Sequence, residues 1–208
     1  MIYKASHHPV IYPFFQCYTL WKIKRNFSGV FINGDYSEKN LPVLLISNHV
    51  SWWDGFWAMY LSMKSFHRKF YYMMLEEQLK KNMFLNKTGG YSIKKDSRSI
   101  LETLDYTAEL LSDKKNLVLM FPQGKIESIY TPAIRFEKGI EHILKKVKGR
   151  IQILFLVNLI DYFSNPKPGL YIYFREYEGS DFDSKNLQKE YNDFYAACVA
   201  ENLRKKES

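Results

Sequence analysis

Residues 41–55 read Leu-Pro-Val-Leu-Leu-Ile-Ser-Asn-His-Val-Ser-Trp-Trp-Asp-Gly, an apolar run that leads directly into a polar and aromatic segment. The run at 41–47 has the length and composition of a buried β-strand. The segment at 47–55 begins where that strand ends. Ligands in α/β sheets bind beside the ends of strands, so this segment is a candidate functional site.

His49 and Asp54 in this segment are suited to acid–base chemistry. A neutral imidazole takes a proton from a hydroxyl, and a carboxylate bonded to its other ring nitrogen fixes the tautomer and stabilises the resulting cation. Five residues on a regular helix turn the chain about 140° beyond one full turn. The two side chains therefore meet only if His49 precedes a helix and Asp54 lies in or near its first turn. Ser51 and Asp54 are candidate caps of that helix. The alternative is a capping Asp54 and an ordinary loop histidine.

Apolar runs and helical periodicities alternate along the chain. Strands are predicted at 30–33, 41–47, 69–74, 91–93, 116–121, 151–157 and 170–174, and helices at 10–27, 54–63, 75–86, 97–112, 136–147 and 183–206. This order predicts an α/β fold with a mostly parallel central sheet and helices on both faces. No repeat, linker or low-complexity stretch divides the sequence, so we expect a single domain over residues 1–208.

The composition favours a partner that carries negative charge. The net charge is +8 and aromatic residues make up 17% of the chain, a combination that suits anionic lipid, nucleic acid or an anionic cofactor. The alternative is an ordinary domain that happens to be basic. Cys17 and Cys198 have apolar neighbours and no metal-ligand spacing, which favours a reducing cytoplasm and predicts no metal site.

Residues 10–27 are the candidate membrane contact. Aromatic and aliphatic side chains come first, and Lys22, Lys24 and Arg25 follow. An interfacial amphipathic helix would bury the first group at the acyl boundary and place the cations among phosphates; the alternative is a helix packed on the protein's own core. The sequence has no apolar run of about 18–20 residues, and the first residues lack the apolar core of a secretory signal. We therefore expect the chain, if it meets a membrane, to lie on it without crossing it.

Two further strands end in loops with polar and cationic groups. The strand at 116–121 is followed at 122–128 by Pro-Gln-Gly-Lys-Ile-Glu-Ser, in which proline ends the strand and glycine permits close backbone approach. The strand at 91–93 follows two glycines and precedes Lys94 and Lys95. Either loop fits a wall of the same site, although the two lysines also fit an ordinary solvated charge pair.

Together, these segments resemble the glycerolipid acyltransferase superfamily, typified by the 1-acylglycerol-3-phosphate acyltransferases of the lysophospholipid acyltransferase family. The first motif of that family, Asn-His-x-x-x-x-Asp, is matched by Asn48, His49 and Asp54. The second is a glycine followed by an apolar segment and a basic residue. It is matched from Gly90 to Lys95, with Lys where Arg is usual.

The third motif of that family is Phe-Pro-Glu-Gly-Thr-Arg-Ser, and its frame is loosely preserved by Phe121, Pro122, Gly124 and Ser128. Gln123 stands where Glu is usual, Lys125 where Thr is usual, and Ile126 where Arg is usual. A fourth, apolar motif is met only in part, at 154–158. The resemblance covers residues 31–160 and implies a motif-bearing core there. Residues 1–30, which lie outside it, form the expected N-terminal helical segment at the membrane interface.

The altered third motif bears on the acceptor. The resemblance implies that basic residues of the second and third motifs hold the acceptor's phosphate. An Arg fork binds phosphate at two points, Lys offers a point charge, and Ile offers nothing. Either Lys125 replaces the missing cation, or the acceptor carries no phosphomonoester at that point. The altered motif therefore weakens the expectation that lysophosphatidic acid is the acceptor. It weakens the expectation of acyl transfer less.

The resemblance implies an O-acyltransferase. His49, oriented by Asp54, acts as general base on a hydroxyl of a lysophospholipid or other lipid acceptor, which attacks the thioester carbonyl of acyl-CoA or acyl carrier protein. These donors are cosubstrates, and no tightly bound cofactor is implied. Ser51 as a nucleophile is a rival. Backbone N–H groups near Gly124 are candidates for stabilising the oxyanion.

Two groups of residues are candidates for binding the substrates. The candidates for the polar parts are Lys94, Lys95, Gln123, Gly124, Lys125 and Ser128. The candidates for an acyl groove, with an equal claim as core aromatics, are Trp52, Trp53, Phe56 and Trp57.

The expected location is peripheral, on the cytoplasmic face of a membrane. The expected partners are anionic lipid, the lipid acceptor and, if it is the donor, acyl carrier protein. One alternative is a degenerate family member that binds lysolipid or acyl chains without turnover, suggested by the altered third motif. Another is a nucleic-acid-binding module, but basic residues are spread along the chain and no nucleic-acid signature appears, so no nucleic-acid partner is expected.

Overall fold

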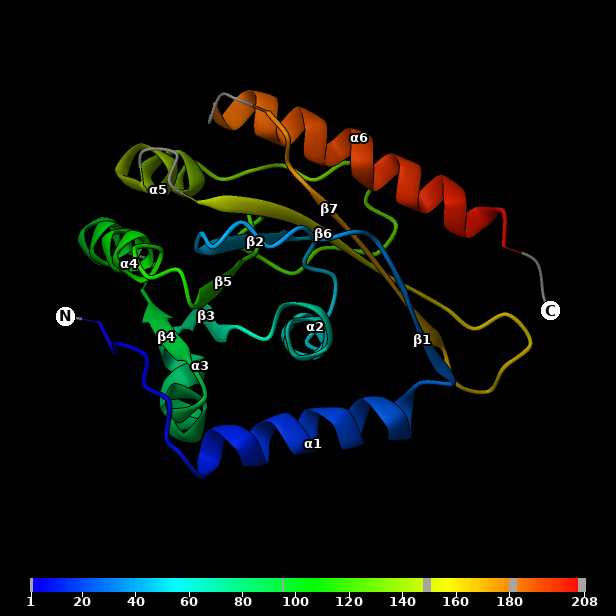
Figure 1. The fold of residues 1–208 in the computed structure, drawn as a ribbon, viewed down its shortest axis with the longest axis horizontal. Coiled ribbons are helices and arrows are strands. Elements are labelled where there is room, and N and C mark those ends of the chain that lie inside the picture. Colours follow the sequence, from blue (N-terminus) through cyan, green and yellow to red (C-terminus); the bar gives the residue numbers. More distant parts are fainter. Residues whose placement is uncertain (1, 95, 148–150, 180–182, 206–208) are drawn as a thin grey trace.

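A seven-stranded sheet forms the centre of the molecule (Figure 1). The computed structural model describes residues 2–94, 96–147, 151–179 and 183–205. The strands are β1 (Gly29–Asn33), β2 (Val43–Ser47), β3 (Lys69–Leu75), β4 (Gly90–Ile93), β5 (Asn116–Met120), β6 (Gln152–Asp161) and β7 (Gly169–Glu176). The helices are α1 (Ile11–Asn26), α2 (Asp54–Leu61), α3 (Glu76–Lys81), α4 (Ser97–Leu110), α5 (Gly139–Val147) and α6 (Ser184–Leu203), with a π-helical turn at Ser62–Phe66 and a 3-10 helix at Met83–Lys87.

The strand order is β1-β7-β6-β2-β5-β3-β4, and β2 lies in the middle, parallel to both β5 and β6. The only antiparallel neighbours among the described strands are β6 and β7. Seven residues, 162–168, separate those two strands, too few for a crossover that would make them parallel. The prediction of an α/β fold with a mostly parallel sheet is confirmed.

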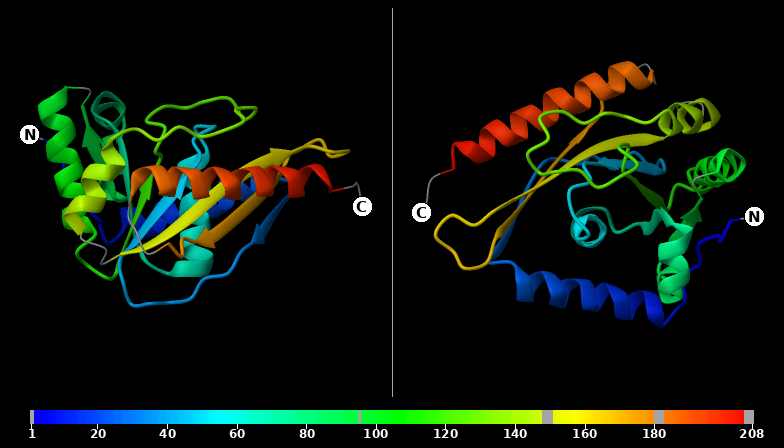
Figure 2. Two further views of the ribbon diagram at one scale, coloured as in Figure 1. Left: turned by 90° about the horizontal axis from the view of Figure 1, so that it is seen from above. Right: turned by 180° about the vertical axis from the view of Figure 1, so that it is seen from behind.

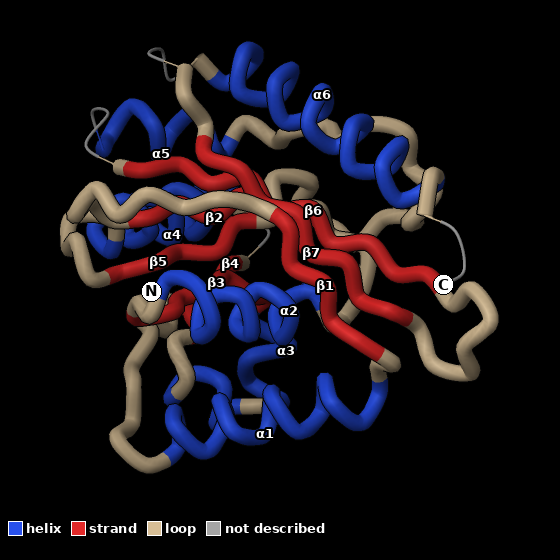
Figure 3. The backbone as a smooth tube through the Cα atoms, turned by 45° about the vertical axis from the view of Figure 1, so that its right-hand side comes forward, coloured by secondary structure: helices blue, strands red, loops and turns tan. Residues whose placement is uncertain are grey.

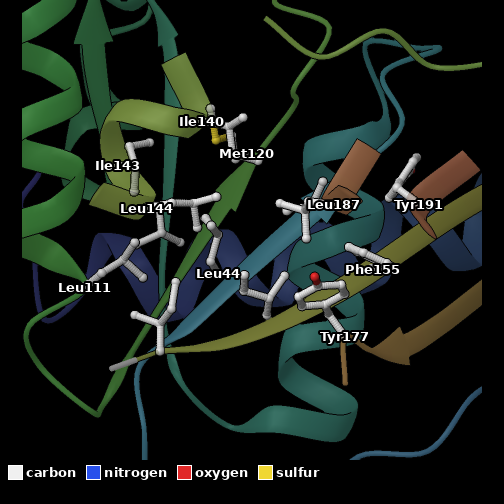
Figure 4. Packing of buried hydrophobic residues seen from close by; sticks show 14 of the residues in the cluster. Leu44, Leu111, Met120, Ile140, Ile143, Leu144, Phe155, Tyr177, Leu187 and Tyr191 are labelled. Atoms are coloured by element: carbon white, nitrogen blue, oxygen red, sulfur yellow. The ribbon is translucent and has the colours of Figure 1, made fainter. Parts of the chain in front are cut away.

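Successive residues of the central strands face opposite sides of the sheet, as the period of a strand requires. Leu44 and Ile46 of β2 belong to one buried cluster, whereas Val43 and Leu45 belong to the other. The first cluster packs beneath α4, α5 and α6, and the second packs against α1 and α2 (Figures 1 and 2). The labelled residues of the first cluster in Figure 4 are Leu44, Leu111, Met120, Ile140, Ile143, Leu144, Phe155, Tyr177, Leu187 and Tyr191.

Several predicted elements have other bounds in the structure, and two of the helices show this clearly. The helix predicted at 75–86 is interrupted at Asn82, which leaves the helical conformation between α3 and the 3-10 helix. The helix predicted at 136–147 begins only at Gly139, and the backbone N–H groups of Phe136 and Glu137 bond to other parts of the chain. The Phe136 N–H donates to the side chain of Gln188, and the Glu137 N–H donates to the carbonyl of Pro122.

Helix α1 has two apolar faces. The sequence predicts that residues 10–27 either contact a membrane or pack on the protein's own core, and each face bears on one of these roles. Phe15, Thr19 and Ile23 recur at intervals of four and are buried, so this face packs on the protein's own core next to α2 (Figure 3). Phe14 and Trp21 lie on another face and are exposed. Among the described residues, no helix has the length and apolarity needed to cross a membrane.

Candidate functional site

The site lies where β2 and β5 end. These strands run parallel, with Ile46 beside Met120, so the segments that follow them leave the sheet at the same edge. The ring of His49, two residues past β2, stacks on the ring of Phe121, one residue past β5. The ring centroids are 4.0 Å apart and the planes differ by 11°. Parallel pairing therefore joins the first and third sequence segments.

Asp54 is the first residue of α2, and His49 lies in the turn before that helix. His49 Nδ1 lies 2.7 Å from Asp54 Oδ2. The same carboxylate oxygen accepts hydrogen bonds from the backbone N–H groups of Val50, at 2.6 Å, and Ser51, at 2.9 Å. The geometric condition for the two side chains to meet is thus confirmed. Their catalytic roles remain a prediction.

The carboxylate of Asp54 is fully buried. Burial raises the pKa of Asp54 above its ordinary value, and the hydrogen bonds from His49, Ser51 and Val50 oppose that shift. An ionised carboxylate only accepts hydrogen bonds, so it requires a proton on Nδ1 of His49, and in a neutral ring with that proton Nε2 carries the lone pair. The His49 side chain is 22% exposed, and it therefore combines an oriented ring with access to solvent. This arrangement is suited to taking a proton from a substrate hydroxyl.

The hydroxyl of Ser51 accepts a hydrogen bond from the N–H of Trp53 at 3.1 Å. Within the described part of the chain, no hydrogen bond joins Ser51 to the imidazole of His49. The His49 imidazole is paired through Nδ1 with Asp54 instead. The geometry therefore favours a base that acts on substrate over a serine nucleophile activated by His49.

The loop after β5 holds the backbone of His49 on both sides. The His49 N–H donates to Gln123 Oε1 at 2.6 Å, and the Glu127 N–H donates to the His49 carbonyl at 2.9 Å. Gln123 Nε2 donates to Glu127 Oε2 at 2.6 Å. Gln123, a candidate for substrate contact, is 3% exposed and uses both ends of its amide within the protein.

Sequence reasoning did not single out Glu127. Counted position by position, the serine of the third motif falls on Glu127, and Ser128 lies one residue beyond it. Ser128 Oγ accepts a hydrogen bond from the N–H of Tyr130. A carboxylate four residues after Gln123 is visible in the sequence, but its contact with the Gln123 amide depends on the fold of the loop.

The candidate cations of the second and third segments are ion-paired where they are described. Lys125 Nζ lies 3.2 Å from Glu127 Oε1, and Lys94 Nζ lies 3.4 Å from Glu76 Oε2. Lys95, the other candidate cation, lies outside the described residues. Ile126 is exposed and brings no charge. The structure therefore does not bring Lys94 into contact with Lys125 or His49.

Gly124 lies in the left-handed region, with φ of +65°, a conformation that glycine adopts without strain. Its own N–H donates to the carbonyl of Phe121 at 3.2 Å. This N–H is therefore part of the turn, and an oxyanion donor near Gly124 would have to come from a neighbouring residue.

Asn48 joins the end of β2 to β6. Its side-chain N–H donates to the carbonyl of Asn158 at 3.0 Å, and its side-chain oxygen accepts from the N–H of Asn158 at 2.9 Å. Both residues are buried. Asn48 therefore extends the pairing of β2 with β6 by one step, immediately before His49.

The candidate groove aromatics divide into two groups. Trp57 is 1% exposed and packs in the core against Phe27. Trp52 is 68% exposed, and it contacts Trp53 and Phe56 with ring centroids 5.7 and 4.9 Å away. Trp53 and Phe56 are partly buried against the core, where Trp53 also contacts Phe27. Of the four candidates, only Trp52 is therefore exposed, whereas Trp57 has the surroundings of a core residue. The described residues contain no cluster of three His, Cys, Asp or Glu side chains suited to a metal ion.

Comparison with known proteins places the motifs in a family. The acyltransferase family model matches residues 29–156, which is more than half of the chain. No curated protein sequence matches the chain. Among solved structures, the fold is similar to that of PlsC, a 1-acyl-sn-glycerophosphate (LPA) acyltransferase from Thermotoga maritima, with a TM-score of 0.59 and 15% sequence identity. The match covers 94% of this chain and 81% of that one.

Proposed function

This chain belongs to the acyltransferase family, and we propose that it moves a fatty acyl group from acyl-CoA or acyl carrier protein to a hydroxyl of a lysophospholipid or other lipid acceptor. The observation that supports this reaction best is the pair of His49 and Asp54, with Nδ1 and Oδ2 2.7 Å apart at the end of the central strand. A protein that only bound lipid would not need an oriented base at this position.

In the proposed mechanism, His49 Nε2 takes the proton of the acceptor hydroxyl as its oxygen attacks the thioester carbonyl. The C–O bond forms, the C–S bond breaks, and the imidazolium returns the proton to the departing thiolate. Asp54 stabilises the transient charge on the imidazole and keeps the reactive nitrogen pointed away from itself. No protein nucleophile takes part, so the acyl group passes to the acceptor in one transfer.

We place the reaction at a membrane surface on its cytoplasmic side. Phe14 and Trp21 of α1 are exposed, and the Arg25 guanidinium lies 5.1 Å from the centroid of the Trp21 ring. Exposed aromatics beside cations suit the boundary between acyl chains and phosphates. The same helix carries Lys22, whose ammonium lies 5.7 Å from the Trp21 ring centroid.

Aromatic contacts link this helix to the segment that carries His49. Phe56 contacts Trp52 at 4.9 Å and Tyr18 at 6.4 Å between ring centroids, and Tyr18 contacts Trp21 at 6.0 Å. This path gives an acyl chain an apolar surface between the membrane and the candidate base. We therefore propose that the acceptor and the acyl chain approach from the side of α1.

The test is thiol release from a panel of acyl-CoA and acyl carrier protein donors. The acceptors are lysophosphatidic acid, other lysolipids and a total lipid extract, each offered to the parent protein and to His49→Ala. We expect acceptor-dependent release by the parent and a loss of about 10²–10⁴-fold in the variant, the range for a general base. No release with any pair, from a folded protein that still binds acyl chains, would instead support a family member without turnover.

A further inference from the structure

Two groups from the loop after β5 bond the backbone of His49, the side-chain oxygen of Gln123 and the backbone N–H of Glu127, and the charged side chain of Glu127 in turn bonds Gln123. We propose that Glu127 is a positioning residue for the base. Its carboxylate orients the Gln123 amide, and Gln123 then holds the N–H of His49. This inference rests on the proposed function, because it assigns Glu127 a role only through His49.

The orientation follows from the donors and acceptors present. The Glu127 carboxylate accepts hydrogen bonds and cannot donate them when ionised, so at 2.6 Å it requires the NH₂ end of the Gln123 amide. The carbonyl end of that amide then faces the His49 N–H, which requires an acceptor. A flipped amide would place oxygen against oxygen at Glu127 and N–H against N–H at His49. The charge on Glu127 therefore favours one of the two orientations of the Gln123 side-chain amide.

Charge and burial keep this arrangement in place. Gln123 is buried, whereas the Glu127 side chain is 22% exposed and lies next to Lys125. The hydrogen bond from Gln123 and the charge of Lys125 hold the pKa of Glu127 below its ordinary value. Glu127 is therefore an anion at neutral pH. Its own N–H donates to the His49 carbonyl, so a single residue reaches His49 by its backbone and, through Gln123, by its side chain.

The arrangement couples positions 123 and 127. A glutamate at 123, the residue usual in the third motif, would place a second carboxylate where the Gln123 amide now donates to Glu127. Two carboxylates this close do not both ionise without a large penalty. A proton shared between them would remove the repulsion. A glutamine at 127 would also remove it, because its NH₂ group donates to a carboxylate at 123.

The decisive variants are Gln123→Glu and the double variant Gln123→Glu with Glu127→Gln. A displacement of about 1 Å at a catalytic group lowers rate by about 10²-fold, so we expect a loss of that order in kcat for Gln123→Glu at pH 8, with little change in KM. The ratio of its kcat to that of the parent should rise as the pH falls, because protonation relieves the repulsion. The double variant should recover most of the loss at pH 8.

A second pair of variants does not depend on Gln123→Glu remaining folded. Glu127→Gln keeps an oxygen that accepts from Gln123, whereas Glu127→Ala does not, so Glu127→Gln should retain more activity. Glu141→Gln is the matched control, because it removes an exposed carboxylate that pairs with Lys145 on α5. Unfolding temperatures show whether each variant is folded.

Two outcomes would overturn the inference. One is a Gln123→Glu enzyme with the kcat and pH profile of the parent. The other is a double variant no more active than Gln123→Glu, together with equal activities of Glu127→Gln and Glu127→Ala. Failure of the parent to transfer acyl groups to any acceptor would overturn the proposed function instead. In that case the NMR titration of His49 in the parent and in Gln123→Glu tests the contact directly, and an unchanged titration would refute it.

Discussion

Asn48, just past the end of β2, and Asn158 of β6 exchange two hydrogen bonds, at 3.0 and 2.9 Å, one residue before the candidate base. The side chain of Asn48 thereby occupies the place of a further residue in the ladder. The first motif thus contains Asn48, which bonds the end of β2 to β6, together with His49 and Asp54, the candidate base and its carboxylate partner.

Asn48→Ala should destabilise the protein and also lower kcat. The change leaves the buried N–H and carbonyl of Asn158 without their partner, which costs about 1–3 kcal/mol, and it loosens the backbone at His49. Asn116→Ala is the matched control, since Asn116 is also buried and donates to the Leu110 carbonyl away from His49. Chemical unfolding and initial rates should show lower stability in both variants but a lower kcat only in Asn48→Ala. An equal kcat in the two would contradict this view of Asn48.

Asp54→Asn should separate activity from stability. Burial raises the pKa of Asp54, so its ionisation opposes folding, and stability from this group falls as the pH rises above the unfolded value of 3.8. Asparagine removes that charge but cannot hold the correct His49 tautomer. We expect a loss of about 10²–10⁴-fold in kcat and an unfolding temperature at pH 7.5 no lower than that of the parent. A variant with near-normal turnover would remove the proposed mechanism.

Phe14→Ser combined with Trp21→Ser should weaken binding to vesicles. Both side chains are exposed on α1, and their loss removes apolar area from the interface without disturbing the buried face of the helix. Sedimentation with vesicles that contain anionic lipid measures the effect. Leu203→Ser is the control, because Leu203 is also exposed but lies on α6, across the sheet from α1 (Figure 1). Equal binding by the parent and the double variant would exclude α1 as the contact.

Ile126→Arg should increase the use of lysophosphatidic acid relative to lysolipids with a phosphodiester. The parent has an exposed apolar side chain where the family motif has arginine, and the nearby Lys125 is paired with Glu127. Hydrogen bonds to a charged group contribute about 1.5–3 kcal/mol, so we expect the ratio of kcat/KM values to change by about 10- to 100-fold. A parent enzyme that already prefers lysophosphatidic acid would show that another cation holds the phosphate.

His7 should make the fold sensitive to acid. Burial lowers the pKa of His7 from 6.5 to about 4, although its hydrogen bond with the Phe70 carbonyl opposes the shift. The unfolded chain therefore binds this proton at a higher pH than the folded chain does. The resulting stability is complete above pH 6.5 and is lost as the pH falls toward 4.

The measurement is the free energy of unfolding against pH for the parent and for His7→Gln. The variant should lose less stability over that pH range, because glutamine does not titrate. His67→Asn removes an exposed histidine in a left-handed conformation, which asparagine tolerates, and serves as the control. Parallel curves for the parent and His7→Gln would show that His7 does not cause the acid sensitivity.

The sequence alone determined the alternation of strands and helices, and with it the parallel sheet. It also determined that His49 and Asp54 could meet, because both lie within six residues at the start of one helix. These features depend on periodicity and on short connections, which are local properties of the chain. The side on which α1 is buried also follows a local repeat at Phe15, Thr19 and Ile23, but the sequence left open whether that repeat faces core or membrane.

Only the tertiary structure decided what Gln123 and Glu127 contact. The sequence predicts substrate contact for Gln123 because it lies in the third motif. In the structure Gln123 is buried and accepts a hydrogen bond from the backbone N–H of His49, 74 positions earlier. That contact exists because β2 and β5 are neighbours in the sheet. The chain between them forms β3 and β4, which lie on the other side of β5, toward one edge of the sheet. Strand order is set by how the whole core packs, so contacts that depend on it cannot be read from local patterns.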